Sequence, residues 1–368
     1  MSINLKRFVD IDIKQHVETR LSGTRDEVIL YTSEGSAGTN LLLESLADAV
    51  KIKTSMPIAY AYAEVFFNNN GAKLKVIEGV PYANITKELL MALDNKYICV
   101  TYAASKDDTE KVYAALETVA NNMQPVKMSG ENQSSIYGIN EKLILSRTAV
   151  STDMTAYANF VVKYSNVVGA EMTMAAYLSR INVYGIDTVY DYMFTQEAIG
   201  EEDVSNEVYD ELITNNYNVD VKLGGIVRNC GGNCKDGADL VNNYVRIILH
   251  QTLTDRLVDV LAQKLKNSSG IAKIYNTITQ ELENYLTCGY LTRDKIWTDS
   301  DLVVTGGNGQ QYTIISKGTA LTNGYVIKVL PLESLTEQDK ALRKAPGIYV
   351  VLADQYGIRS ITINGEII

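Results

Sequence analysis

The sequence predicts a multidomain protein of the α/β class, with α and β elements mixed and a β-strand arm at each end of the chain. In the first 150 residues, short apolar strand segments alternate with helix patterns, which indicates a largely parallel sheet covered by helices. Two long helix patterns follow between residues 236 and 289, and both termini alternate polar and apolar residues as strands do. At 368 residues the chain is long enough for two or three domains.

The first predicted domain covers residues 25–150 and alternates strands with helices. Pro57 lies at the first turn of its second helix and Gly71 lies beyond the end, which are the positions that these residue types favour. The predicted strands are Glu27–Tyr31, Lys73–Glu78, Tyr97–Tyr102, Pro125–Met128 and Leu143–Ala149. The predicted helices are Leu41–Val50, Ile58–Phe67, Asn84–Leu93 and Asp107–Asn121.

A mixed α/β segment is predicted for residues 151–220, and a helix pair with a sheet for residues 221–345. From Val241 to Leu265 apolar residues recur every four positions and predict one long helix, and Ile271 to Tyr285 form the apolar face of a second. The other predicted elements are a strand at Phe160–Tyr164, helices at Val168–Val183 and Val204–Asn215 with a solvated acidic start at Glu201–Asp203, a hairpin tip at Gly306–Gly309, strands at Tyr312–Ser316 and Tyr325–Leu330, and a charged link at Thr336–Lys344.

Both ends of the chain have the alternating pattern of β-strands. In the amino-terminal arm, residues 1–24, one strand face carries Val9, Ile11 and Ile13. In the carboxyl-terminal arm, residues 346–368, the apolar residues are Ile361, Ile363, Ile367 and Ile368, with a hairpin turn signal at Asn364-Gly365. Too few residues follow that turn to close a stable hairpin, and an unpaired apolar edge aggregates unless it has a partner. The arms are therefore predicted to be exchanged as strands between subunits.

Composition argues against several classes of protein. The net charge of −10 disfavours a sequence-independent nucleic-acid binder, which needs a basic surface to neutralise phosphates. No apolar run approaches the roughly 20 residues of a transmembrane helix, and residues 1–7 lack the pattern of a secretory signal. Four sparse cysteines fit a reducing compartment. Two histidines argue against hydrolytic or metal chemistry, whereas 24 tyrosines favour interfaces.

A glycine pair, Gly35 and Gly38, lies between the first strand and a predicted helix. Loops of this kind can hold a phosphate, because their N–H groups point at an anion on a helix N-terminus. This loop lacks the lysine of a P-loop and the third glycine of a dinucleotide fingerprint, so an ordinary tight turn is favoured. The alternative that it leaves open is a cytoplasmic α/β enzyme binding a phosphorylated ligand.

Cys230 and Cys234 have a spacing that resembles that of metal ligands, and Cys99, Cys288 and His250 are conceivable further ligands. Zinc sites usually have two close-spaced ligand pairs, and only one pair occurs here. The intervening glycines are better explained by a sharp backbone turn. The sequence therefore predicts no catalytic residue, no cofactor site and no metal site.

One cationic cluster stands out on this acidic chain, at Lys340, Arg343 and Lys344. A solvated surface is the simpler interpretation, and contact with a partner of complementary charge is the alternative.

Three groups of sequence segments are informative because of the order in which they occur along the chain. They are Ala63–Gly71 with the strand Lys73–Glu78; Cys234–Asp239 before a long helix, with a second helix that ends at Gly289–Leu291; and Arg343–Pro346 with an apolar strand, Gly357 and Ile361–Ile363. In this order, over about two-thirds of the chain, they resemble the sheath proteins of contractile phage tails and phage-tail-like bacteriocins. The Pro-Gly-Val-Tyr stretch that many sheaths carry near the amino end is missing, and the chain lacks the large insertions of big phage sheaths.

The resemblance implies a sheath-type fold and a structural, non-enzymatic function. Sheath subunits stack as six-fold rings around an inner tail tube, and their terminal arms insert as strands into the sheets of neighbours. Contraction drives the tube through a target envelope. The implied partners are further copies of the chain, a tail tube protein, and baseplate and tail terminator proteins, with no nucleic acid and no membrane insertion. The implied location is a virion tail or bacteriocin particle assembled in the bacterial cytoplasm, and Lys340, Arg343 and Lys344 become candidate tube contacts.

Overall fold

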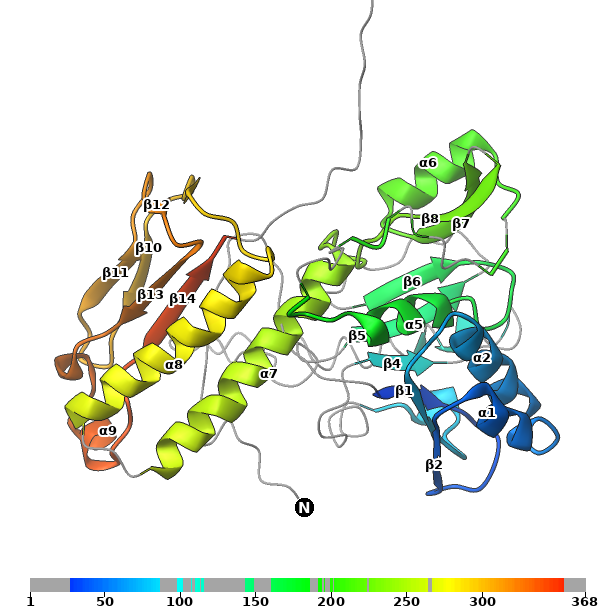
Figure 1. Ribbon diagram of the computed structural model, residues 1–368, viewed down its shortest axis with the longest axis horizontal. Coiled ribbons are helices and arrows are strands. Elements are labelled where there is room, and N and C mark those ends of the chain that lie inside the picture. The colour runs from blue at the N-terminus through cyan, green and yellow to red at the C-terminus, as the bar shows by residue number, and fades with distance from the viewer. Residues whose placement is uncertain are drawn as a thin grey trace, which may run out of the picture. The chain divides into compact units, whose positions relative to one another are not determined.

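The computed structural model describes residues 27–86, 98–101, 107, 110–112, 114–115, 143–148, 160–185, 191–193, 195, 199–200, 202–223, 225–263 and 267–353. These residues form two compact units (Figure 1). The large-sheet unit comprises the described residues 27–181 and 191–241. The helix-pair unit comprises the described residues 182–185 and 242–353.

An eight-stranded sheet with the order β2-β3-β1-β4-β5-β6-β7-β8 organises the large-sheet unit. Its strands are β1 (Glu27–Tyr31), β2 (Asn40–Leu43), β3 (Lys73–Ile77), β4 (Ile98–Thr101), β5 (Leu143–Thr148), β6 (Phe160–Tyr164), β7 (Asn218–Leu223) and β8 (Ile226–Cys230). The inner strands are parallel, whereas β2 and β8 run antiparallel to their neighbours. Parallel strands are covered on both faces, which explains why β1 and β6 are almost uninterrupted apolar runs.

Helices α1 (Leu46–Ile52), α2 (Pro57–Asn68) and α5 (Met172–Arg180) pack in a row, with α2 between the other two. α5 also contacts β1, β4 and β5. The Glu34 carboxylate caps the N-terminus of α2. It accepts hydrogen bonds, at 3.1 and 2.8 Å, from the N–H groups of Ile58 and Ala59, which have no partner within the helix. The side chains that α2 buries are Ala59, Tyr60, Tyr62, Ala63 and Phe66.

Helix α6 (Asn206–Thr214) packs against β7. It begins after Ser205, whose hydroxyl accepts a hydrogen bond from the N–H of Val208. Its Leu212 is fully buried in a cluster with residues from β6, β7 and β8. These are Val162, Tyr217, Val219 and Cys230.

Two long helices, α7 (Leu240–Ala262) and α8 (Asn267–Thr287), lead into the small strands of the helix-pair unit, to which α7 belongs from its third residue on. The strands are β9 (Lys295–Ile296), β10 (Leu302–Thr305), β11 (Gln311–Ile315), β12 (Ala320–Leu321), β13 (Tyr325–Val329) and β14 (Ile348–Leu352). They form the antiparallel ladders β10–β11, β12–β9 and β13–β14. Their shared core is Trp297, Ile314, Ile315, Leu321, Leu330, Val351 and Ala353.

Most predicted elements agree with the structure to within a few residues. The α/β class is confirmed, β1 and β6 have the predicted bounds, and helices are present at α2, α5, α6, α7 and α8. Residues 107, 110–112, 114 and 115 are helical, as predicted. The Pro125–Met128 strand lies outside the described residues, as does most of the Asn84–Leu93 helix, of which Asn84 ends a short 3₁₀ turn (Tyr82–Asn84).

Three local predictions were wrong. Residues 41–43 are not helical, because Asn40–Leu43 pairs antiparallel with β3 as β2, and the helix begins only after Ser45, whose side chain accepts the N–H of Asp48. The charged link contains a helix, α9 (Glu337–Ala341), capped by the hydroxyl of Thr336. Glu202 is not solvated but buried, because the Ser165 hydroxyl and the Asn166 amide donate to its carboxylate.

Three further observations concern the ends of the predicted segments. Strands from both 25–150 and 151–220 lie in the same eight-stranded sheet. Residues 267–270, which lie between the two predicted long helices, are the first turn of α8. The start of the predicted carboxyl-terminal arm is β14, which is paired within its own chain.

Candidate assembly site

The β13–β14 ladder has the geometry needed to take up further strands. Two hydrogen bonds show which opposed residues of the ladder are hydrogen-bonded pairs. They run from Leu330 N–H to Gly347 O (2.9 Å) and from Ala353 N–H to Gly324 O (2.8 Å), one at each end of the ladder. In an antiparallel ladder, hydrogen-bonded pairs alternate with pairs whose main-chain groups point outward. Because Gly324 and Leu330 are hydrogen-bonded positions, the alternation makes Val326 one as well, so its N–H and C=O point toward β14. The outward residues are therefore Tyr325, Ile327 and Val329 on β13 and Ile348, Val350 and Leu352 on β14.

Along β13, the outward main-chain groups of Ile327 and Val329 lie on partly exposed residues, where a new strand can reach them. None of the six residues makes a main-chain hydrogen bond to any residue that the structure describes outside the ladder. Such edges pair readily with another chain, since each N–H and C=O that is removed from water needs a partner. The ladder therefore offers a candidate strand-binding edge along β13, whereas two of the three outward residues of β14, Val350 and Leu352, are buried.

The side chains beneath the ladder hold it in place. Val350, Val351 and Leu352 are 2%, 1% and 6% exposed, and Val351 belongs to the core of the unit. α8 packs against β13, and the Tyr325 hydroxyl donates a 2.5 Å hydrogen bond to Glu283 of α8. Burial, together with this bond to a carboxylate, raises the pKa of Tyr325 and keeps the phenol a donor. The two strands are thus preformed before any partner arrives.

The predicted inter-subunit arms lie outside the described residues. This applies to Val9, Ile11 and Ile13 of the amino-terminal arm and to Ile361, Ile363, Ile367 and Ile368 of the carboxyl-terminal arm. Their strand assignment stays a prediction.

The predicted cationic cluster lies at the end of α9. Lys340 pairs with Glu337 and Lys344 with Asp339, each at 2.7 Å, so both ammonium groups have a carboxylate within their own segment. No ion pair joins Arg343 to a residue in the part of the chain that the structure describes. Arg343 is exposed and has a φ of 56°, in the left-handed region that favours glycine. Arg343 is thus the member of the cluster best placed to meet an outside partner.

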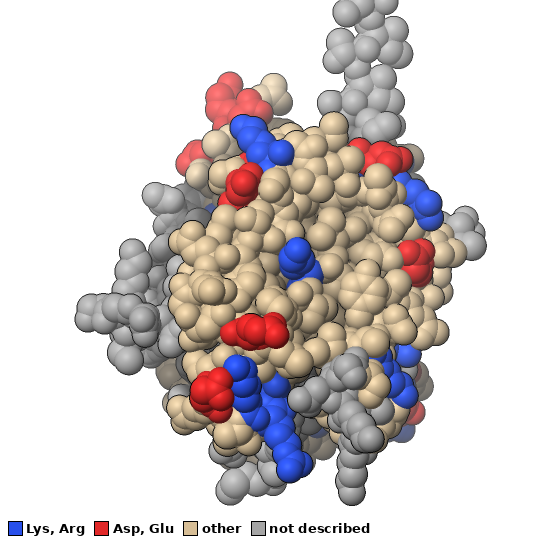
Figure 2. All heavy atoms as spheres, turned by 90° about the vertical axis from the view of Figure 1, so that its left-hand side faces the viewer, with Lys and Arg blue, Asp and Glu red and all other residues tan. Residues whose placement is uncertain are grey.

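Charged side chains of both signs are mixed on the surface of this unit. Figure 2 views the molecule from the side on which β10 and β11 lie in Figure 1 and shows a largely uncharged face, with Lys and Arg scattered among Asp and Glu.

The glycine loop is not a phosphate site. After Gly38 the chain enters β2, so no helix N-terminus follows the loop. The N-terminus of α2 already binds the Glu34 carboxylate, and Glu78 accepts the N–H of Ser36 at 3.0 Å. A Cβ at Gly35 would lie 2.3 Å from the Glu78 carboxylate. Because two carboxylates already use these donors and would repel an anion, the enzyme alternative is not supported.

Three cysteines whose side chains the structure describes are buried and form no disulfide. Cys230 and Cys234 lie in the large-sheet unit and Cys288 in the helix-pair unit. Gly231 has a φ of 116°, and a Cβ there would lie 2.7 Å from the carbonyl oxygen of Tyr217, so the turn requires glycine. No group of three or more His, Cys, Asp or Glu able to hold a metal was found in the described part of the chain, which leaves out the side chains of Cys99 and His250.

Solved structures similar to this chain over its full length are contractile assemblies. A chain of the anti-feeding prophage helical sheath in its contracted state aligns with a TM-score of 0.65 and 12% identity, covering 98% of each chain. The fold is that of a contractile sheath protein. A chain of the PVC sheath complex, from an extracellular contractile injection system in the contracted state, has a TM-score of 0.62 and 10% identity over 100% of this chain and 98% of its own.

A third similar structure, the six-fold symmetrised baseplate of the anti-feeding prophage, contains a chain with a TM-score of 0.62 and 15% identity, covering 97% of this chain and 98% of that one. No protein-family model and no curated protein sequence matches the chain. The resemblance seen in three groups of loose motifs thus corresponds to a sheath fold along the whole chain. Among its described helices, none has the length and apolarity required to cross a membrane.

Proposed function

We propose that this chain is the structural subunit of a contractile sheath, which polymerises as stacked six-fold rings around an inner tube and contracts to drive the tube through a target envelope. The observation that carries the proposal is the whole-length fold similarity to chains of two contracted sheaths. The proposed role is mechanical and not enzymatic. The proposed particle is a virion tail or a bacteriocin, assembled in the cytoplasm of its bacterial host.

The outward edge of β13 supports self-assembly by strand addition. In this proposal a terminal arm of a neighbouring subunit adds to this edge, with main-chain bonds providing affinity and alternate side chains providing register. Burying each of the four isoleucines of the carboxyl-terminal arm would contribute roughly 1.5–3 kcal/mol as an upper range.

Electron microscopy of the purified chain is the test of the proposed function. Helical tubes or rings are expected, whereas small discrete oligomers would contradict it. Deleting Ile358–Ile368 should leave a folded protein that does not polymerise, because the donor strand is gone. Long polymers formed by the truncated chain would show that this arm is not the connector.

The amino-terminal arm allows a matched pair of substitutions. Ile11→Asp places a charge on the predicted apolar face and should prevent assembly, because a buried unpaired charge is costly. Asp12→Asn lies on the opposite face and should assemble normally. Equal polymer yields from the two variants would contradict the strand assignment.

The tube contact is proposed at the end of α9. A sheath has to release its tube on contraction, and exposed charge pairs worth about 0–1 kcal/mol each suit a reversible contact. Lys340, Arg343 and Lys344 are the proposed residues, and Arg343 carries the charge that no described residue pairs. The double variant Arg343→Glu, Lys344→Glu should polymerise alone but fail to assemble around tubes. Normal co-assembly with tubes would refute this contact. Baseplate and tail terminator proteins are the proposed partners at the sheath ends.

A further inference from the structure

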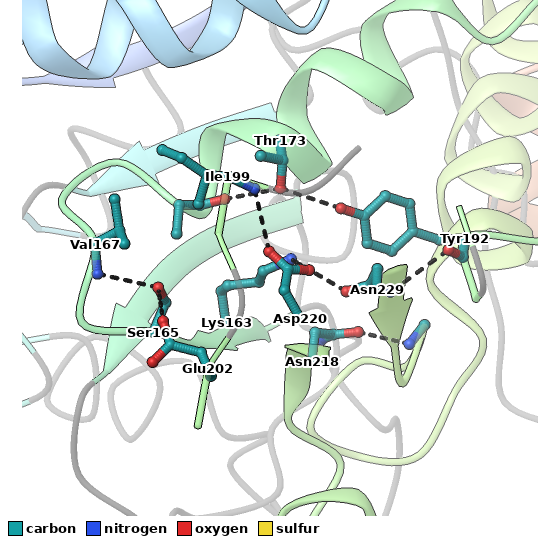
Figure 3. Close-up of polar contacts among 12 residues, drawn as sticks. Lys163, Ser165, Val167, Thr173, Tyr192, Ile199, Glu202, Asn218, Asp220 and Asn229 are labelled. Atoms are coloured by element: carbon teal, nitrogen blue, oxygen red, sulfur yellow. Dashed lines mark hydrogen bonds and ion pairs between the residues drawn. The ribbon is translucent and has the colours of Figure 1, made fainter. Parts of the chain in front are cut away.

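Lys163 is buried in the large-sheet unit together with an aspartate and an asparagine. The relative exposures of Lys163, Asp220 and Asn229 are 0%, 1% and 0%. The Lys163 Nζ donates hydrogen bonds to Asp220 Oδ1 at 2.5 Å and to Asn229 Oδ1 at 3.2 Å. Figure 3 shows the lysine side chain extending from β6 toward the two partners, which stand on the neighbouring strands.

The strand register sets up this arrangement. Asp220 on β7 and Asn229 on β8 are directly opposed in the antiparallel ladder, so their side chains emerge on the same face. β6 lies beside β7, with Lys163 opposite Asn218, two residues before Asp220 and therefore on that face as well. Three neighbouring strands at the β8 end of the sheet thus bring an amine, a carboxyl group and a carboxamide together in the interior.

These three groups are the reactants and the proton-transfer group needed to form an amide between two side chains. We propose that Lys163 and Asn229 form an intramolecular isopeptide bond, with Asp220 as the catalytic residue that transfers the protons. The reaction needs no oxidant, metal or cofactor. It would tie β6 to β8 across β7 and close a loop between residues that are 66 positions apart.

The proposed reaction is a transamidation in which ammonia is the leaving group. The ammonium of Lys163 gives a proton to the carboxylate of Asp220 across their hydrogen bond, which burial favours because both groups become neutral. The amine lone pair attacks Asn229 Cγ, one bond away from the oxygen that Lys163 already contacts, while Asp220 protonates that oxygen. The Nζ–Cγ bond forms, and Asp220 moves one proton from the former amine nitrogen to Nδ2. The oxygen then returns its proton to Asp220 as the carbonyl re-forms, the Cγ–Nδ2 bond breaks, and Nδ2 leaves as ammonia.

The surrounding groups hold the reactants in place. Asn229 Nδ2 donates to the Tyr192 carbonyl oxygen at 3.4 Å, which turns the amide oxygen toward Lys163. The Lys163 Nζ lies 5.8 Å from the centre of the Tyr192 ring, and the hydroxyl of that ring is 3.1 Å from Thr173 Oγ1. The Ile199 N–H reaches the second oxygen of Asp220 at 3.4 Å. Because the reacting groups are already held together, the reaction avoids the entropy cost of bringing two separate molecules together.

A second buried ion pair in the large-sheet unit lacks the groups that this reaction needs. Arg147 and Glu171 are 3% and 0% exposed, with 3.9 Å between Nε and Oε2. That pair has no amine nucleophile, because a guanidinium stays protonated. The Lys163 cluster differs by adding a carboxamide to an amine that can lose its proton.

Intact-mass spectrometry of the denatured full-length chain tests the proposal. The wild-type protein, after incubation in its folded state, should be lighter than its sequence mass by one ammonia. Peptide mapping should recover a branched peptide that joins Lys163 to Asn229. A wild-type chain with its full sequence mass would overturn the proposal, and this measurement does not depend on any variant folding. A loss of one water instead would join Lys163 to Asp220 and also overturn it.

Variants assign the roles of the residues. Lys163→Arg and Asn229→Ala should restore the full mass, because each removes a reactant. Asp220→Asn keeps both reactants but removes the proton-transfer group, so it should also restore the full mass or slow the loss of ammonia. Lys222→Arg, at an exposed lysine on β7, is the matched control and should keep the loss. A loss of ammonia that persists in Lys163→Arg would place the reaction elsewhere and refute the assignment.

Discussion

A proline on the outward side of β13 tests the candidate assembly site most directly. In Ile327→Pro the missing N–H is one that points away from β14, so the ladder within the chain keeps its bonds. An incoming strand would lose a donor and would meet the pyrrolidine ring. The variant should therefore fold but assemble poorly.

The size of the effect follows from the bonds at this edge. β13 offers an N–H and a C=O from each of Tyr325, Ile327 and Val329 to an added strand. A main-chain hydrogen bond contributes about 1 kcal/mol net. Losing one bond outright and weakening its neighbours costs about 1–3 kcal/mol per contact, which raises the critical concentration for polymerisation roughly 5- to 150-fold.

The assay is sedimentation of polymer over a range of chain concentrations, with thermal unfolding as the check on the fold. Ile327→Val keeps the N–H and should behave as wild type. Lys328→Pro, one residue further along, removes a donor that faces Tyr349 and should destabilise the folded chain itself. If Ile327→Pro polymerised at the wild-type critical concentration, strand addition at β13 would be refuted.

Three further predictions concern stability. Burial raises the pKa of Glu171 from 4.5 to about 7 against the opposing charge of Arg147, so the folded state holds this proton more tightly than the unfolded state. Its contribution to the unfolding free energy should rise by about 3 kcal/mol as the pH falls from above 7 to below 4.5, and denaturant titrations of Glu171→Gln should lack this component. Tyr325→Phe should cost about 1–3 kcal/mol in such titrations, because it removes the bond to Glu283; a Tyr325→Phe variant as stable as wild type would contradict the role of that bond. Ser205→Ala should cost about 1 kcal/mol by uncapping α6, and Ser205→Asp should restore it.

The sequence was most informative where one element faces one environment. β1 and β6 are buried parallel strands, and their apolar runs predicted their bounds. α8 has its apolar stripe at Ile274, Ile278 and Leu282, which are 8%, 1% and 0% exposed. Leu41–Leu43 was misread because a short apolar run fits either a helix or a strand, and pairing with β3, a contact distant in sequence, decides between them.

The buried polar groups were the main omission. Lys163 within the apolar strand Phe160–Tyr164 was a readable signal, because a lysine in a buried parallel strand needs a partner. Its partners could not be predicted, since Asp220 and Asn229 lie far along the chain and depend on the order β6-β7-β8. The outward phase of the β13–β14 ladder likewise depends on which pairs are hydrogen-bonded, which the alternation of side chains does not reveal.

An isolated pair of strands is only marginally stable, yet β13 and β14 have to be ordered before a neighbour can add to them. The apolar core under Val351, the packing of α8 and the Tyr325–Glu283 bond supply that order within one chain. The acceptor therefore loses little conformational entropy on binding, and the cost of ordering falls mainly on the incoming arm. In the proposed assembly, affinity between subunits would then be set by the length of the arm and its apolar residues. Shortening the arm should thus weaken assembly stepwise without changing the free energy of unfolding of the subunit. Assembly and the stability of the subunit can then vary independently, as a polymerising subunit requires.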